Sequence, residues 1–116
     1  MHELAVTKSI LRLVLNAAQQ KKAKKIQAIY LIVGEMRNLE QDWIQRYFDY
    51  ISKDTIAEGA QIEVTKVPVA FGCKLCGKEF TADLYENKKL LCPYCGGFEY
   101  TLLFGRELLV EKMEVV

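Results

Sequence analysis

The chain has 116 residues, of which 51% are hydrophobic and 27% charged, and its formal net charge is +1 at neutral pH. This length fits one small domain, alone or with an inserted module, and the composition excludes wholesale disorder. The nearly neutral charge argues against a nucleic-acid-binding protein, which would carry a strongly basic surface.

The sequence also indicates where the protein works. No apolar run approaches the ~20 residues that a membrane-spanning helix needs. The opening residues Met1-His2-Glu3 place an acid where a signal peptide would have basic residues. We therefore expect a cytoplasmic protein with no membrane partner. In a reducing compartment its four cysteines are expected to bind a metal and not to form disulfides.

The first predicted elements are a helix and a strand. From Glu3 to Gln20, apolar residues recur at helical spacing with polar residues on the opposite face, which predicts an amphipathic helix that covers a sheet. A basic run at 21–25 follows the helix. The nearly unbroken, β-branched apolar run from Ile26 to Val33 then predicts a central strand buried on both faces.

A second helix is expected from about Leu39 to Lys53, where Ile44 and Phe48 belong to an apolar stripe. Alternation predicts a strand at 61–66. A last strand is expected at 107–115, and its alternation slips at Glu111-Lys112, which suggests a bulge.

The expected fold class is therefore α+β, with two helices packed on a small three-stranded sheet. A zinc-ribbon module is expected as an insertion before the last strand. The predicted domains are 1–69 with 102–116, which form the α+β domain, and 70–101, which form the metal module.

The four cysteines form two matched pairs. Cys73-Lys-Leu-Cys76 is followed by 15 residues and then by Cys92-Pro-Tyr-Cys95. Each Cys-x-x-Cys pair can turn tightly enough to place two sulfurs on one cation, and two pairs supply a tetrahedral set. Glycine follows the second cysteine of each pair, where it permits a positive φ. This pattern predicts a structural zinc site.

The cysteine pairs have two alternative interpretations. A redox dithiol is usually a single Cys-x-x-Cys in a thioredoxin-like setting, which two matched pairs do not resemble. An iron–sulfur cluster also takes four thiolates and stays open as an alternative. Zinc is favoured, and four thiolates would leave it no open position for catalysis.

The only histidine of the chain is His2. It could be an ordinary side chain at a frayed terminus. Its chemistry offers a second interpretation, because the α-amine of Met1, the amide nitrogen of His2 and the His2 imidazole can close adjacent chelate rings on one metal. Nitrogen donors held nearly in a plane suit Ni(II) or Cu(II).

Motifs along the whole chain carry a family resemblance. They are the opening Met1-His2-Glu3-Leu4, Val33-Gly34-Glu35, the segment 55–60, the cysteine pairs, and Gly105-Arg106-Glu107-Leu108 before the last strand. In this order they resemble the HypA/HybF family of hydrogenase-maturation nickel metallochaperones.

The resemblance implies a nickel-binding domain and a zinc domain. It implies that nickel is cargo, delivered to the large subunit of [NiFe]-hydrogenase together with a nickel-handling GTPase, and in some bacteria also to urease. The nickel-binding histidine of the family corresponds to His2, and Glu3 and Glu40 match acidic positions that are further candidate nickel ligands. Met1 is a candidate through its α-amine. The zinc ligands of the family correspond to Cys73, Cys76, Cys92 and Cys95.

No enzymatic machinery is expected. The single histidine excludes a His-Glu-x-x-His site, and the sequence has no glycine-rich phosphate loop. The alternative function is a zinc-ribbon adaptor or nucleic-acid-binding module without a nickel role. Against nucleic acid, the lysines of the cysteine module are offset by nearby acidic residues.

Overall fold

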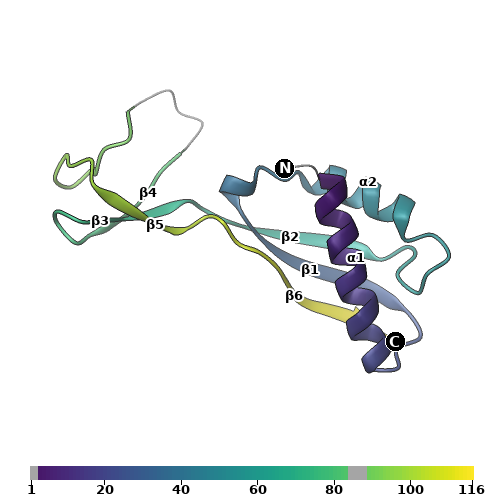
Figure 1. Cartoon of the computed structure of the whole chain (residues 1–116). Helices are drawn as coiled ribbons and strands as arrows, with labels where there is room; N and C mark the ends of the chain where they lie inside the picture. The colour runs from purple at the N-terminus through teal and green to yellow at the C-terminus, as the bar shows by residue number, and fades with distance from the viewer. Residues whose placement is uncertain (1–2, 84–88) are drawn as a thin grey trace. The chain divides into compact units, whose positions relative to one another are not determined.

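The computed structural model describes residues 3–83 and 89–116 (Figure 1). The chain divides into two compact units. The first unit comprises Met1–Ile32, Leu39–Thr65 and Leu109–Val116, and the second comprises Val33–Asn38 and Lys66–Leu108. The domain boundaries expected from the sequence stay a prediction. In the part of the chain that the structure describes, no helix is both long and apolar enough to cross a membrane.

Two helices and a three-stranded sheet form the α+β architecture. They are α1 (Glu3–Gln20), β1 (Ile26–Gly34), α2 (Gln41–Ile51), β2 (Gln61–Val67) and β6 (Leu108–Val115). The strand order is β2-β1-β6, so β1 is central, as its apolar sequence predicted. Ile26 and Ile29 of β1 are both fully buried. The predicted fold class is confirmed.

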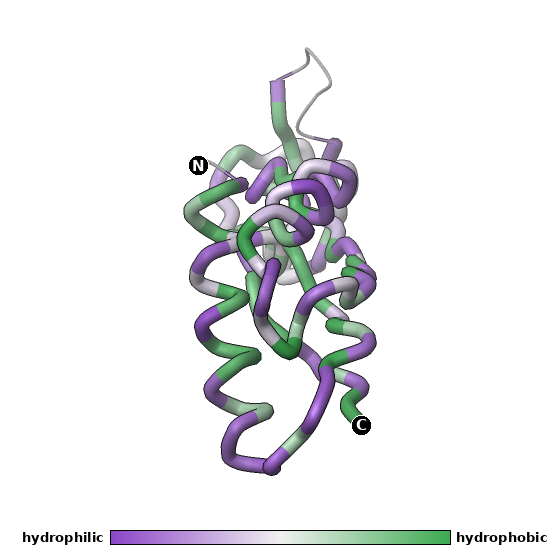
Figure 2. The backbone as a smooth tube through the Cα atoms, turned by 90° about the vertical axis from the view of Figure 1, so that its right-hand side faces the viewer, coloured by the Kyte–Doolittle hydropathy of each residue, from purple (hydrophilic) through white to green (hydrophobic). Residues whose placement is uncertain are grey.

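Helix α1 is amphipathic and lies across the sheet (Figure 1). Hydrophobic and hydrophilic residues alternate along its turns (Figure 2). Ile10, Val14 and Ala18 are buried, as the periodicity of the sequence predicts. Thr7 is also fully buried, and its hydroxyl donates a hydrogen bond to the backbone carbonyl of Glu3 one turn earlier. Burial of this polar side chain is therefore compatible with the apolar face.

Helix α2 is shorter at both ends than predicted. Ile44 and Phe48 are completely buried, which confirms the core of the predicted stripe. Trp43 stacks on Tyr47 with ring centroids 5.7 Å apart, but 47% of Trp43 remains exposed, as does 72% of Tyr50. The aromatic residues beside the stripe therefore contribute little to the core.

Two glutamines of α2 also bond to the backbone at the start of β2. The side-chain amide of Gln41 donates to the carbonyl of Ile62 at 3.1 Å, and that of Gln45 donates to the carbonyl of Ala60 at 3.1 Å. The Gln45 carbonyl oxygen accepts from the Ile62 amide at 2.7 Å. Because β2 is an outer strand, these side chains satisfy backbone groups that the sheet leaves free.

A second sheet, of order β4-β3-β5, organises the cysteine module. It consists of β3 (Ala70–Cys73), β4 (Glu79–Thr81) and β5 (Tyr100–Phe104), and β3 pairs with both neighbours in antiparallel fashion. The sequence predicted the module but not these strands, because segments of three to five residues are too short to show a period. As expected, the module is inserted before β6.

The second unit also contains a close backbone contact at the short helix η1 (Glu35–Arg37). The amide of Gly34 donates to the carbonyl of Glu107 at 2.7 Å, and that of Met36 donates to the carbonyl of Gly105 at 2.9 Å. A Cβ atom on Gly34 would lie 2.0 Å from the Gly105 oxygen. Only glycine fits at this position.

Candidate metal centre

The four cysteine side chains converge on one point in the second unit. The Sγ atoms of Cys73 and Cys95 are 3.6 Å apart, and those of Cys76 and Cys92 are 3.7 Å apart. All four sulfurs lie within 4.8 Å of one another. Within residues 3–83 and 89–116, this is the one group of three or more cysteine, histidine or acidic side chains that could share a metal ion.

The two Cys-x-x-Cys turns are built alike. The amide of Gly77 donates to the carbonyl of Cys73 at 2.9 Å, and the amide of Gly96 donates to the carbonyl of Cys92 at 2.8 Å. Both glycines have positive φ, at 77° and 74°. The glycine after each pair thus has the backbone conformation that the sequence predicted.

A further bond closes each turn and fixes the first cysteine of the pair. The Cys73 amide donates to the carbonyl of Lys78 at 2.9 Å, and the Cys92 amide donates to the carbonyl of Gly97 at 2.8 Å. A Cβ atom on Gly97 would lie 2.5 Å from Leu75 of the other turn. Sequence reasoning singled out Gly96 but missed Gly97, and the Gly-Gly pair after Cys95 was the available signal.

The donor geometry fits a tetrahedral metal ion. Metal–sulfur bonds of ~2.3 Å in a tetrahedron separate the sulfurs by ~3.8 Å. The two closest pairs, Cys73 with Cys95 and Cys76 with Cys92, are within a few tenths of this value. Cys73 and Cys92 are buried, and Cys76 and Cys95 are exposed. A cation held by all four thiolates would have no free coordination position.

The pKa values of three of these thiols are shifted in different directions, which shows how strongly the sulfurs affect one another. The backbone amide of Cys76 stabilises the Cys73 thiolate and, against the effect of burial, lowers its pKa to about 6. The Gly97 amide acts likewise on Cys95, but the neighbouring Cys73 sulfur and burial together raise the pKa of Cys95 to about 12. For Cys76, burial and the sulfurs beside it outweigh the backbone amide of Lys78 and raise the pKa. Like charges this close disfavour one another, and a bound cation would stabilise the ionised form of all four thiols.

A small aromatic cluster supports the cysteines. Phe71 of β3 contacts Phe80 of β4 and Tyr100 of β5, with ring centroids 5.7 Å and 5.0 Å apart. The Tyr100 hydroxyl donates to the carbonyl of Leu90 at 3.2 Å, in the segment that leads to Cys92. These contacts tie the second cysteine pair to the sheet that carries the first.

The candidate nickel ligands near the N-terminus, unlike the four cysteines, do not form a cluster within the described residues. Met1 and His2 lie outside the described residues. Glu3 is half-buried in the first turn of α1. Glu40 is exposed and precedes α2, where its backbone carbonyl accepts from the Ile44 amide at 3.1 Å. Within the described segments, neither carboxylate belongs to a cluster of three or more potential ligands.

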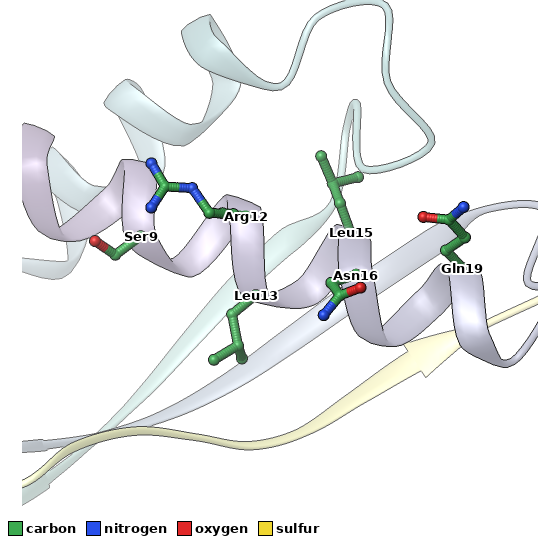
Figure 3. A pocket seen from close by; sticks show the side chains of 6 residues that line it. All are labelled: Ser9, Arg12, Leu13, Leu15, Asn16 and Gln19. Carbon is green, nitrogen blue, oxygen red and sulfur yellow. The ribbon is translucent and has the colours of Figure 1, made fainter.

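A hollow on the surface of α1 is not a candidate metal site. Figure 3 shows the side chains that line it, which all come from α1: Ser9, Arg12, Leu13, Leu15, Asn16 and Gln19. None of them is a cysteine, histidine, aspartate or glutamate, so the hollow has none of the usual protein ligands for a metal ion.

The fold and the site together define an α+β protein of two helices and small sheets whose clustered cysteines can hold a metal ion, consistent with a zinc ribbon. The chain belongs to the HypA family. The family model described as "Hydrogenase/urease nickel incorporation, metallochaperone, hypA" matches residues 1–115. This confirms the resemblance found in the sequence, and it identifies a metallochaperone family and not a family of enzymes, as predicted.

Similar proteins agree with this membership. A "Hydrogenase maturation factor HypA" of Dehalococcoides mccartyi is 36% identical over 115 residues, which cover 99% of this chain and 94% of the relative. A protein of the same name from Archaeoglobus fulgidus is 35% identical over 99% of this chain and 98% of its own length. The solution structure of the Ni metallochaperone HypA from Helicobacter pylori shares the fold, with a TM-score of 0.65 at 20% identity over 100% of this chain and 98% of that one.

Proposed function

We propose that this protein is a nickel metallochaperone that binds Ni(II) at its N-terminus and helps to insert it into the large subunit of [NiFe]-hydrogenase. The supporting observation is that the family match begins at residue 1 and so includes Met1-His2-Glu3. In this proposal the protein works in the cytoplasm with a nickel-handling GTPase, which supplies the nucleotide hydrolysis. It needs neither nucleic acid nor a membrane.

The four cysteines are proposed to hold a structural zinc ion. Thiolate ligands in a tetrahedral set suit zinc, and the sulfur separations of 3.6 and 3.7 Å match that geometry. Because the set is closed, the ion would stabilise the module and would not exchange with the cargo.

The nickel site is proposed to be open and exchangeable. The α-amine of Met1 and the amide nitrogen and imidazole of His2 supply donors that suit Ni(II). Glu3 and Glu40 are candidates for further oxygen ligands, and α1 and α2 begin at the same end of the first unit (Figure 1). The positive end of the α1 dipole disfavours a cation beside it, and the Glu3 carboxylate offsets this effect. A site with few charged ligands can release its ion to a stronger site.

Metal analysis on untagged protein tests the proposal. Wild type should retain one zinc per chain and additional nickel, whereas His2→Ala should retain the zinc and lose the nickel. Glu3→Gln and Glu40→Gln, tested in the same way, would show whether either carboxylate is a ligand. Equal nickel retention by wild type and His2→Ala would contradict the proposed site.

Nickel binding should also depend on pH. An unperturbed imidazole has a pKa of ~6.5, and protonated imidazole cannot bind a metal. The apparent nickel affinity should therefore be greatest above this pH and should fall as the pH drops through it. Competition with a metal indicator across the pH range measures this dependence. Nickel retention that is unchanged well below pH ~6 would argue against imidazole ligation.

A zinc-ribbon adaptor is the second candidate function, favoured by exposed aromatic side chains on the metal module. Tyr94 is 60% exposed with Lys78 over its ring, and Phe98 is 71% exposed. Aromatic and basic side chains together can stack on single-stranded nucleic acid. Salt-dependent binding to single-stranded RNA or DNA, lost in Phe98→Ala, would support this function; we expect negligible binding.

A further inference from the structure

Helix α2 carries a row of aromatic and basic side chains on its outer side. This aromatic-basic row consists of Trp43, Arg46, Tyr47, Tyr50 and Lys53. The first four fall within an arc of roughly 100° on one side of the helix, and Lys53 follows just beyond the C-cap. Trp43 and Tyr50 are exposed, and Tyr47, which stacks on Trp43, is half-buried. The core therefore does not explain why these large side chains gather there.

Each base of the row lies over one of its aromatic rings. The Arg46 guanidinium carbon is 5.1 Å from the centre of the Trp43 ring. The Lys53 Nζ atom is 5.5 Å from the centre of the Tyr50 ring. These contacts hold the two cations against the apolar surface, so that a single ligand can meet a ring and a positive charge together.

Both bases also have an acid at the spacing at which helical ion pairs form. Asp42 precedes Arg46 by four residues, and Asp49 stands at the same interval before the second base, Lys53. Within residues 3–83 and 89–116, neither base forms an ion pair. Asp49 instead accepts a hydrogen bond from the Gln45 side chain at 2.8 Å. The two cations are therefore available to carboxylates from another molecule.

The row contains a repeat with a period of seven residues. Trp43 is followed three positions later by Arg46, and Tyr50 is followed three positions later by Lys53. Seven residues make about two turns of a helix, or ~10.5 Å, so both aromatic–base pairs face the same way. Packed helices present equivalent positions to each other at this interval. A partner helix can therefore meet both pairs with a repeated set of its own side chains.

From these observations we propose that the aromatic-basic row docks an acidic amphipathic helix of a partner protein. Apolar side chains of that helix cover the three aromatic rings, and two of its carboxylates bond to Arg46 and Lys53. Because these bases are seven residues apart, the two carboxylates lie seven residues apart in the partner helix. Trp, Tyr and Arg are also the residue types that contribute most to binding at protein interfaces.

The acids beside the row favour a protein partner over nucleic acid or a lipid surface. Asp42 and Asp49 follow the bases around the helix, on the side away from the aromatic rings. A polyanion bound at Arg46 and Lys53 would bring further phosphates close to these carboxylates, which repel them. A helix can place carboxylates opposite the bases and neutral or basic side chains opposite the acids.

The fluorescence of Trp43 provides the test, because this residue belongs to the row and is the single tryptophan of the chain. The probe is a stapled, tryptophan-free helical peptide of about 18 residues, with leucines at i, i+3, i+7 and i+10 and glutamates seven residues apart beside them. Titrated into untagged protein, it should shift the Trp43 emission to the blue and reach saturation. The same peptide with lysine in place of each glutamate should bind roughly tenfold more weakly or worse.

Two variants with matched controls test individual contacts. Tyr50→Ala should weaken peptide binding roughly tenfold, whereas Leu13→Ala, which truncates an exposed apolar side chain of α1, should bind like wild type. Arg46→Glu should also weaken binding and should prefer the lysine peptide. Lys25→Glu makes the same change in charge at another exposed base and should leave binding unchanged. All four variants retain Trp43, and circular dichroism shows whether each is folded.

Three outcomes would overturn the proposal. They are the absence of a saturable response of Trp43 to the glutamate peptide, equal binding of the lysine peptide, and equal binding by Tyr50→Ala and Leu13→Ala. A response only to oligouridylate, or only to vesicles of phosphatidylglycerol and phosphatidylcholine, would also overturn it and would assign the row to nucleic acid or lipid.

The docking surface goes beyond the proposed nickel function and does not depend on it. His2→Ala should bind the glutamate peptide like wild type, while metal analysis of the same variant tests the nickel site. Failure of one proposal is therefore distinguishable from failure of the other.

Discussion

The two units of the molecule are stabilised in different ways. The first unit buries large apolar side chains from both helices and the sheet, including Phe48, Ile29 and Leu31. Among its described residues, the second unit has a cluster of five buried side chains, Val69, Phe71, Cys73, Phe80 and Cys92, with partly buried hydrophobic residues packed against it. Two of the five are candidate metal ligands, so the same residues form the core and the site. The comparison shows a unit held by apolar burial beside one that depends on its cysteines.

The surface of the second unit leads to the same conclusion. Leu75, Tyr94 and Phe98 are 61%, 60% and 71% exposed, although each is large and apolar or aromatic. A module of this size cannot enclose such side chains, and small modules commonly gain stability from a bound metal. Metal removal should therefore affect the two units unequally.

The largest expected effect is that of removing the metal ligands. Cys92→Ser, or chelation of the proposed zinc, should unfold the second unit, because structural zinc sites contribute on the order of 10 kcal/mol to the folding of small modules. Amide hydrogen exchange should show lost protection in β3 and β5 and retained protection in α1 and β1. Lys74→Ser, at an exposed position beside Cys73, is the control and should change neither unit. Full protection of β3 without metal would contradict this view.

The second-largest effect is expected in the first unit, from truncation of its buried Phe48 side chain. Phe48 is completely buried, and Phe48→Ala should lower the free energy of unfolding by about 3–5 kcal/mol. Urea denaturation followed by the fluorescence of Trp43, the single tryptophan of the chain, reports on this unit directly. Tyr50→Ala on the same helix is the control; since Tyr50 is 72% exposed, its loss should change stability by less than about 0.5 kcal/mol. Similar losses in both variants would argue against a core centred on Phe48.

The contrast between the units also explains what the sequence could predict. The helices and the central strand of the first unit were predictable because a large core imposes a long apolar period on the chain. The cysteine pairs were predictable because spacing alone brings each pair together. The strands β3, β4 and β5 were missed, since they contain only four, three and five residues.

Two further features of the fold could not be predicted, because each arises from a contact between residues far apart in the sequence. The 2.0 Å approach of a Gly34 Cβ to the Gly105 oxygen joins residues far apart in the chain, so the sequence shows two ordinary glycines. The polarity of Gln45 indicates only a solvent-facing helical position, yet its side chain bonds to the start of β2. The N-terminal nickel ligands stay a prediction.

The smallest expected effect concerns a polar contact in the first unit, the one between the Gln45 side chain and the start of β2. It tests how much such a contact adds to a unit that is stabilised mainly by apolar burial. Gln45→Ala removes the bonds to the Ala60 carbonyl and the Ile62 amide and should destabilise the first unit by about 1–2 kcal/mol. Gln19→Ala, the same substitution at an exposed position of α1, should be neutral within about 0.5 kcal/mol. Both are measured by urea denaturation with Trp43 fluorescence.

A loss in Gln45→Ala no larger than that in Gln19→Ala would mean that water replaces the side chain without penalty at this edge. The expected loss is smaller than that of Phe48→Ala because a partly buried backbone group can bond to a water molecule instead, whereas the protein around an emptied apolar site relaxes only in part. Comparing the two losses therefore shows whether the buried Phe48 side chain or the polar contact of Gln45 with β2 contributes more to the stability of the first unit.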